Sequence, residues 1–276
     1  MSKNFDYELI DSGDRRRIER FGPYVINRPC PQAVWRLQSD LMDHDIYFDR
    51  DNKKWTGKKI PESWNIQVGE NTSELRLSPN GQVGIFPEQW NNWQWIESIV
   101  EKNKDKKLKI LNTFSYTGMA SLAASHKNTE VCHVDGAKSA INWAKKNAEL
   151  SGKSENHIRW ICDDVIKFLE REVRRGNKYD GIILDPPAFG RGAKKDWKLD
   201  RDLESLMKLV SQVLTDDALF VILTCHAPEL FHEEDLAYIL EDLPQFKDIK
   251  AEPLILEIPC EHGTALDTSF GARIRR

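Results

Sequence analysis

The most restrictive feature of this sequence is a regular alternation of short apolar runs and helix-forming stretches between residues 109 and 258. The runs expected to form strands are residues 109–112, 130–135, 157–161, 179–184, 219–224 and 249–258. The stretches expected to form helices are residues 117–125, 138–150, 165–175, 199–214 and 228–243. Strands that alternate with helices are joined by right-handed crossovers. The pattern therefore predicts an α/β fold with a doubly wound, Rossmann-like sheet.

Residues 1–85 have a different pattern, in which short strand-like runs are separated by turn residues. The runs are residues 24–26, 33–37, 64–68 and 74–77, and Ser78-Pro79-Asn80-Gly81 is a strong turn signal. We therefore expect two domains, a small β-rich N-terminal module at residues 1–85 and the α/β domain at residues 86–276.

The composition of the 276-residue chain is that of an ordinary soluble protein. It contains no apolar stretch long enough to span a bilayer and no signal peptide. The five cysteines are odd in number, widely spaced and without a CxxC pair, which favours a reducing compartment and disfavours a zinc site. We expect a cytoplasmic protein without membrane segments or metal, and the sequence leaves the oligomeric state open. Because the net charge is −4, binding to nucleic acid would need a local basic face.

One of the expected strands, residues 179–184, ends abruptly at Asp185. Pro186 and Pro187 follow, and because proline has no amide hydrogen the strand ladder cannot continue through them. A stiff corner is thus predicted at the carboxyl end of a strand, where open α/β sheets bind ligands. The alternative is a rigid loop that only caps the strand.

Three successive strands are followed by carboxylates, namely Asp135, Asp164 and Asp185. Neighbouring strand ends meet at one edge of the sheet, where these acids would repel one another, so the fold alone explains them poorly. Asp135 follows the first strand-to-helix turn by roughly 20 residues, where an acid can hold ribose hydroxyls. Taken singly, Asp135 or Asp164 could instead cap the next helix. The first turn, residues 112–118, lacks GxGxxG, which favours a ligand without a diphosphate, such as S-adenosylmethionine.

Several segments resemble the ordered motifs of class I S-adenosylmethionine-dependent methyltransferases. They are Gly84-Ile85-Phe86-Pro87-Glu88-Gln89, Asn112-Thr113-Phe114-Ser115-Tyr116-Thr117-Gly118, Val134-Asp135-Gly136-Ala137-Lys138, Asp164-Val165 and Asp185-Pro186-Pro187-Ala188-Phe189. Within that class, the chain is most similar to the large-subunit ribosomal RNA methyltransferases that modify cytosine C5 or guanine N7. The resemblance covers about residues 80–230 and implies S-adenosylmethionine as the cofactor, an RNA base as the substrate and a function in ribosomal RNA processing.

The resemblance also assigns roles to single residues. The implied cofactor-binding residues are Phe86, Gln89, Asn112, Thr113, Phe114, Tyr116, Gly118, Asp135, Gly136, Asp163, Asp164 and Asp185. Among them, the turn 112–118 would hold the methionine part, Asp135 the ribose and Asp164 the adenine. The implied catalytic residues, which would border the methyl group and the target base, are Asp185, Pro186, Pro187 and Phe189. Phe189 would stack on a base that has been swung out.

Cys225 follows the strand 219–224, where the cytosine-C5 members hold their nucleophile, and His226 could lower its pKa. The alternative is a small buried residue at a strand end. Lys194, Lys195 and Lys198 follow the Asp185 loop, where they could meet a phosphate backbone or form a solvated face. Two alternatives to RNA methylation stay open: methylation of a protein or small molecule, and binding of cofactor or RNA without catalysis.

Overall fold

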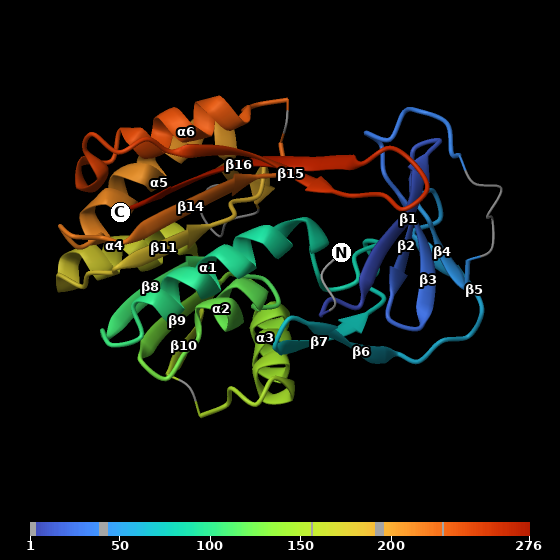
Figure 1. Ribbon diagram of the computed structural model, residues 1–276, viewed down its shortest axis with the longest axis horizontal. Coiled ribbons are helices and arrows are strands. Elements are labelled where there is room, and N and C mark those ends of the chain that lie inside the picture. The colour runs from blue at the N-terminus through green and yellow to red at the C-terminus, as the bar shows by residue number, and fades with distance from the viewer. Residues whose placement is uncertain (1–3, 39–43, 156, 191–195, 228) are drawn as a thin grey trace. The chain divides into compact units, whose positions relative to one another are not determined.

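The computed structural model describes residues 4–38, 44–155, 157–190, 196–227 and 229–276 (Figure 1). The chain divides into two compact units. The first contains Met1–Trp90, Lys146–Gly152 and Glu257–Thr268, and the second contains Asn91–Lys145, Lys153–Leu256 and Ser269–Arg276. The linear division of the chain at residue 85 stays a prediction, and the two units are described separately below.

The first unit is built mainly of strands, shown in blue and cyan in Figure 1. β1 (Tyr7–Gly13), β2 (Arg16–Phe21), β3 (Tyr24–Pro29), β4 (Ile46–Asp49) and β5 (Lys54–Gly57) form one sheet in that order. All neighbours in this sheet are antiparallel except β3 and β4. β6 (Ser63–Val68) and β7 (Asn71–Arg76) form a separate antiparallel pair, and a 3₁₀ turn, η1, covers Pro87–Gln89.

One strand predicted for this unit does not form. Residues 33–37 have an alternating pattern but are irregular in the structure. Their carbonyl groups accept hydrogen bonds from the turn between β1 and β2: Asp14 N–H donates to Trp35 O, and Arg15 N–H donates to Ala33 O, both at 2.7 Å. The prediction was wrong because a single turn satisfies the carbonyl groups of Ala33 and Trp35 without a strand partner.

The second unit contains a seven-stranded sheet in the order β10-β9-β8-β11-β14-β16-β15. The strands are β8 (Leu108–Thr113), β9 (Thr129–Asp135), β10 (Ile158–Cys162), β11 (Gly181–Leu184), β14 (Phe220–Cys225), β15 (Glu252–Ile258) and β16 (Leu266–Arg275). The first five strands in this order are parallel, and β16 is antiparallel to β14. A short antiparallel pair, β12 (Phe189–Gly190) and β13 (Trp197–Lys198), stands apart from the sheet.

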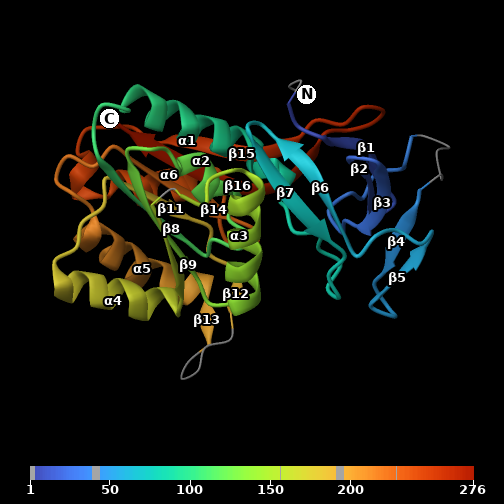
Figure 2. The same ribbon diagram turned by 90° about the horizontal axis from the view of Figure 1, so that it is seen from below.

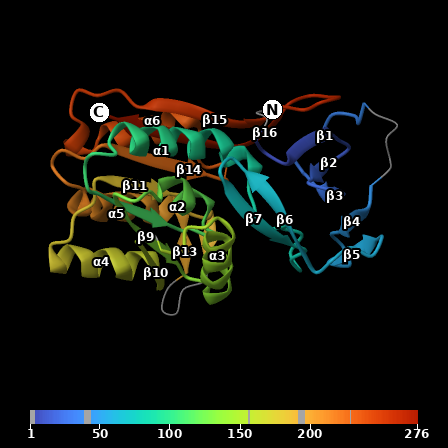
Figure 3. The same ribbon diagram turned by 60° about the horizontal axis from the view of Figure 1, so that its bottom comes forward.

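Helices cover both faces of this sheet. They are α1 (Trp90–Lys102), α2 (Met119–Ala124), α3 (Lys138–Leu150), α4 (Val165–Arg175), α5 (Leu199–Val213) and α6 (Glu233–Glu241), and a second 3₁₀ turn, η2, covers Pro244–Phe246. Figures 2 and 3 show α4 and α5 on one face and α1 on the other. In α5, buried Leu203, Leu206, Met207 and Val210 recur at helical spacing, and they join one apolar core with residues of α4, α6 and the sheet.

The predicted doubly wound α/β fold is confirmed, and the differences lie at its edges. β16 was not predicted, because Gly271 and two arginines interrupt its apolar pattern. The helix expected at residues 228–243 covers only Glu233–Glu241. The β12–β13 pair was also missed, since two residues on each side leave too little periodicity to detect.

Candidate active site

The order of strands reverses between β8 and β11, and this is where open α/β sheets bind ligands. In the parallel register, Leu184 of β11 lies between Thr113 of β8 and Leu223 of β14. The residues that follow these positions are therefore neighbours at the carboxyl edge of the sheet. On the other side of β8, Asp135 pairs with Cys162 at the ends of β9 and β10. The three acid-ended strands thus converge as the sequence predicted.

The turn after β8 is tightly curled. Phe114, Tyr116 and Gly118 have φ angles of 54°, 47° and 92°. Such angles are costly for residues other than glycine, and they concentrate at functional sites. At Gly118 a Cβ would stand 2.9 Å from the Cβ of Ala144, so the position also requires glycine for lack of space. Within this turn Tyr116 donates its N–H to Asp135 Oδ2 at 2.8 Å, and this bond ties the turn to the end of β9.

Asn112 and Thr113 support this turn from inside the protein. Both are buried, and Asn112 Nδ2 donates to Ser121 Oγ at 2.8 Å while Thr113 Oγ1 donates to Ile183 O at 3.3 Å. Ser121 Oγ also lies 2.9 Å from Nδ1 of His133. Burial lowers the pKa of His133 to about 3, so the ring is neutral. Sequence reasoning missed Ser121 and His133, although a polar residue in an apolar strand is a usable signal.

Asp135 binds two backbone amides and can accept more. Its Oδ2 accepts the N–H of Tyr116 and its Oδ1 accepts the N–H of Ala137, each at 2.8 Å. A carboxylate has about four acceptor sites, so ribose hydroxyls can still bind to it. The next residue, Gly136, is exposed. These features fit a nucleoside at the end of β9.

Asp163 and Asp164 follow β10 and have different partners. Asp164 is the N-cap of α4, because its Oδ1 accepts the N–H of Lys167 at 3.0 Å. The helix-cap alternative for Asp164 is therefore observed, and the bond of its exposed side chain to adenine stays a prediction. Asp163 forms an ion pair with Arg171, and its backbone N–H donates to Asp135 O at 3.0 Å. The ends of β9 and β10 are thereby tied together.

Asp185 lies in a polar cluster at the ends of β11 and β14. Thr224 Oγ1 donates to Asp185 Oδ1 at 2.6 Å, and His226 Nε2 lies 3.5 Å from the same oxygen. Burial would raise the pKa of Asp185, but His226 and the Thr224 hydroxyl more than offset it, so the pKa is lowered and the carboxylate is ionised. The side chain is 26% exposed, which leaves it accessible to a ligand.

The two prolines after Asp185 are held by the β12–β13 pair. Trp197 Nε1 donates to Pro187 O at 2.7 Å, and the Trp197 ring lies 5.7 Å from that of Phe114. Pro186 is buried and Pro187 is exposed. Phe189 is 52% exposed, which is unusual for a large apolar side chain. The corner therefore presents an aromatic ring to solvent beside an ionised carboxylate.

The structure favours the buried-residue alternative for Cys225. Its side chain is 1% exposed, and Sγ lies 3.8 Å from Ala227 O. Burial, with smaller contributions from the nearby Asp185 and Glu229, raises the pKa of the thiol to about 11. His226 contacts Asp185, whose charge disfavours a thiolate nearby. A nucleophilic thiolate is thus poorly supported at this position.

We expect Cys225→Ala to keep nearly full activity. The thiol is buried and protonated, so its loss should cost some packing but no chemical step. The measurement is the rate of methyl transfer from labelled S-adenosylmethionine, with Cys132→Ala as a control for a buried cysteine elsewhere in the sheet. A Cys225→Ala variant that folds and binds the cofactor but transfers nothing would restore the nucleophile interpretation.

Phe86, Gln89 and the lysines after the Asp185 loop are the remaining predicted positions. Phe86 and Gln89 belong to the first unit, where Gln89 N–H donates to Phe86 O at 3.1 Å in η1, and their role at the cofactor stays a prediction. Lys194 and Lys195 lie outside the described residues. Lys198 is described, is exposed and pairs with Phe189 across β12 and β13.

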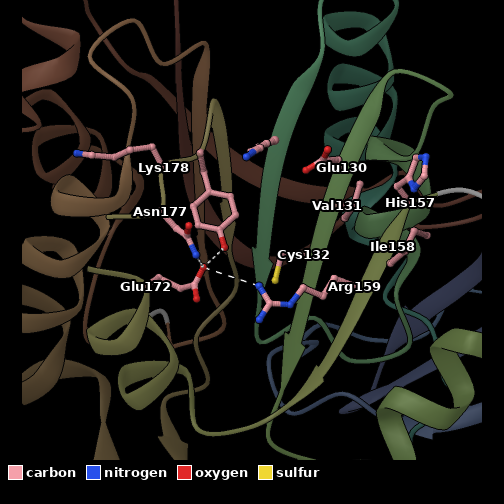
Figure 4. A pocket seen from close by; sticks show the side chains of 11 residues that line it. Glu130, Val131, Cys132, His157, Ile158, Arg159, Glu172, Asn177 and Lys178 are labelled. Carbon is pink, nitrogen blue, oxygen red and sulfur yellow. Dashed lines mark hydrogen bonds and ion pairs between the residues drawn. The ribbon is translucent and has the colours of Figure 1, made fainter. Parts of the chain in front are cut away.

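A cavity of about 490 Å³ lies at the opposite edge of the sheet (Figure 4). Its lining comes from the starts of β8, β9 and β10 and from the end of α4. Buried Glu172 is satisfied there by Tyr179 Oη at 2.7 Å and Asn177 Nδ2 at 2.8 Å. None of the predicted site residues lines this cavity, so it is not the candidate active site.

A family model for S-adenosylmethionine-dependent methyltransferases matches residues 32–242. The chain therefore belongs to the S-adenosylmethionine-dependent methyltransferase family. This membership confirms the predicted class of enzyme, its Rossmann-like fold and S-adenosylmethionine as the cofactor. Within the described residues, no group of His, Cys, Asp or Glu could hold a metal ion, and no helix is long and apolar enough to cross a membrane.

Several known proteins are similar to this chain. The crystal structure of an S-adenosylmethionine-dependent methyltransferase from Agrobacterium tumefaciens is 34% identical, with a TM-score of 0.91 over 98% of this chain and 90% of that one. Ribosomal RNA large subunit methyltransferase I of Erwinia tasmaniensis is 30% identical over 161 residues, 55% of this chain and 41% of that protein. Ribosomal RNA large subunit methyltransferase K/L of Pseudoalteromonas atlantica is 29% identical over 192 residues, which are 67% of this chain and 25% of that protein. The chain spans about half, or less, of the length of these curated relatives.

Proposed function

We propose that this protein transfers the methyl group of S-adenosylmethionine to a base in RNA, with large-subunit ribosomal RNA as the substrate class. The observation that carries the proposal is that ionised Asp185 and half-exposed Phe189 both belong to the corner that follows β11. The names of the curated relatives support the choice of RNA. The five free cysteines fit a cytoplasmic location, which is part of the same proposal.

The carboxyl edge of the sheet fits the cofactor. S-adenosylmethionine supplies an electrophilic methyl carbon on a positively charged sulfur. The turn 112–118 would wrap the methionine part, and Asp135 would accept hydrogen bonds from the ribose hydroxyls. Asp163 and Asp164, beside exposed Gly136, would border the adenine. Phe86 and Gln89, which belong to the first unit, are proposed to bind the cofactor from the resemblance alone.

The corner that follows β11 would face the methyl group of the cofactor and the target base. Asp185 places a negative charge where a sulfonium must be held, and this favours its binding in a partly desolvated site. Pro186 and Pro187 fix the backbone that follows, so the geometry of the approach is set before the substrate binds. Phe189 offers a face on which a flipped base can stack. Lys198 lies opposite Phe189 and could contact a phosphate.

The proposal is tested by supplying S-adenosylmethionine labelled in the methyl group together with total RNA, ribosomal subunits, total protein or small metabolites. We expect label in RNA, and in the large-subunit fraction above the others. Label in protein or in small molecules would show that this class of molecule, and not RNA, is the substrate. Bound cofactor without transfer to any fraction would support a binding protein without catalysis.

Asp135→Ala should weaken the binding of S-adenosylmethionine by about 1–3 kcal/mol, because ribose hydroxyls and two backbone amides lose their acceptor. The dissociation constant, measured by calorimetry, should rise roughly 5- to 150-fold. Asp105→Ala, in the exposed segment before β8, is the control and should bind normally. An unchanged dissociation constant for Asp135→Ala would refute the ribose role.

Cys162 offers a second test of the cofactor position. It is the exposed cysteine among the five, and its Sγ lies 3.8 Å from Gly136 O, beside the predicted adenine site. We expect S-adenosylmethionine to slow the alkylation of Cys162 at least about fivefold, since a bound ligand excludes the reagent. Cys260, partly buried in the first unit, is the internal control. Equal rates with and without cofactor would place the adenine elsewhere.

A further inference from the structure

The contacts of Asp185 are distributed unevenly between its two oxygens. Thr224 Oγ1, at 2.6 Å, and His226 Nε2, at 3.5 Å, both approach Oδ1. Among the described residues, the structure records no such contact to Oδ2. Because Asp185 is 26% exposed, this arrangement leaves one acceptor oxygen for a ligand while the other is held by the protein.

Thr224 is itself held in place. Its side chain is 1% exposed, and it pairs with Gly271 of β16. A Cβ at Gly271 would lie 3.0 Å from Thr224 Cγ2, so the glycine makes the space that the threonine methyl group uses. Such confinement restricts χ1 of this β-branched side chain, and its hydroxyl group donates to Asp185 Oδ1. The antiparallel strand β16 therefore contributes to the geometry of the candidate site.

We propose that Thr224 and His226 are positioning residues, which fix the carboxylate of Asp185 by its Oδ1 and direct Oδ2 to the reacting groups. This inference rests on the proposed methyl transfer. Methyl transfer is an in-line displacement, and misplacement of a charged group by even about 1 Å is costly for such a reaction. A carboxylate without these partners would rotate about χ2 and lose the geometry. The lowered pKa of Asp185 is consistent with this arrangement.

Two conservative substitutions test Thr224. Thr224→Val keeps the volume and removes the hydroxyl, and it should lower kcat about tenfold or more with KM for S-adenosylmethionine within twofold. Thr224→Ser retains the hydroxyl and should recover most of the rate. The matched control is Thr215→Val, because Thr215 Oγ1 makes a similar contact to Asp180 Oδ1, at 3.4 Å, at the opposite edge of the sheet. A Thr224→Val enzyme with normal kcat would overturn the proposal.

A double-mutant cycle shows whether Thr224 acts through Asp185. In an Asp185→Asn background, Thr224→Val should change the residual kcat less than twofold, because the group that it positions is already altered. His226→Gln should likewise lower kcat in the wild-type background. In the Asp185→Asn background it should change kcat little further. His157→Gln, an exposed histidine at the opposite edge, is the control for His226. If the fold-losses in kcat of the single variants multiply in the double variants, Thr224 and His226 act independently of Asp185. That result would overturn the proposal.

The failure of this inference is distinguishable from that of the proposed function. The assay uses the full chain, methyl-labelled S-adenosylmethionine and purified total RNA, and the wild-type protein is measured first. Absence of label in RNA with the wild-type protein refutes RNA methylation. Label with the wild-type protein and equal rates in the Thr224 and His226 variants refutes the positioning role alone.

Discussion

Replacing Asp185 by alanine should lower kcat for methyl transfer by about two to three orders of magnitude, which corresponds to roughly 2.7–4 kcal/mol of transition-state stabilisation. The reason is electrostatic. The carboxylate is ionised and lies at the strand edge where the sheet order reverses, so its removal takes away the negative charge nearest to the expected sulfonium. The same substitution removes the carboxylate oxygen that the Thr224 hydroxyl and His226 contact.

Asp185→Asn separates the charge of this residue from its shape. The amide can keep the contact to Thr224 but carries no charge, so an effect as large as that of alanine would assign the loss to electrostatics. Asp217→Ala is the matched control, because Asp217 is exposed in the turn before β14 at the opposite edge of the sheet. The rates should be measured in single turnovers, so that product release does not hide the chemical step. An Asp185→Ala enzyme within a factor of three of wild type would remove Asp185 from the mechanism.

Much of this site could be predicted because its residues follow strands. The ends of parallel strands meet at one edge whatever the details of packing, so Asp135, Asp164 and Asp185 could be brought together from the sequence alone. The turn 112–118 could be located for the same reason. The direction of each side chain could not be predicted so well. Asn112 and Thr113 were expected to bind the cofactor, and the structure shows their side chains buried beneath the turn that would do so.

The features that sequence reasoning missed depend on contacts between distant segments. Thr224 follows four apolar residues in β14, and its contact with Asp185 becomes visible only when β11 and β14 are paired. The role of Gly271 needs β16, whose alternation of buried and exposed residues is irregular. Cys225 at a strand end could be either a nucleophile or a small buried residue. Its low exposure favours the second interpretation, and exposure cannot be read from the sequence.

A second large effect is expected in the first unit, which holds a buried ionic cluster. Glu19 is fully buried and accepts hydrogen bonds from Arg28 Nε at 2.7 Å, Arg28 Nη2 at 3.0 Å and Tyr7 Oη at 2.9 Å. Arg17 Nε lies 3.3 Å from the same carboxylate. Burial would raise the pKa of Glu19, but the attraction of Arg17 and Arg28 outweighs it, and the pKa is lowered.

Glu19→Gln should destabilise the first unit by about 3–5 kcal/mol, because removal of one charge leaves two guanidinium groups without their counter-charge, one of them fully buried. Glu8→Gln is the control. Its ion pair with Arg20, at 3.2 Å, is exposed and should contribute at most about 1 kcal/mol. The measurement is urea unfolding, with hydrogen exchange of the β1–β3 amides to assign the loss to this sheet. Equal stabilities of the two variants would show that the cluster contributes no more than a surface pair.

The same cluster predicts how the stability of this unit depends on pH. Since the folded-state pKa of Glu19 lies below its unfolded value of about 4.3, the stabilisation is complete above that value and is lost as the pH falls through the lowered folded-state pKa. Protonation of Glu19 in the wild-type protein leaves Arg17 and Arg28 beside an uncharged side chain, as Glu19→Gln does. The free energies of unfolding of the two proteins should therefore converge in acid and differ most near neutral pH. A constant difference between pH 7 and pH 3 would show that the carboxylate charge does not stabilise the sheet, and that the loss in the variant comes from packing.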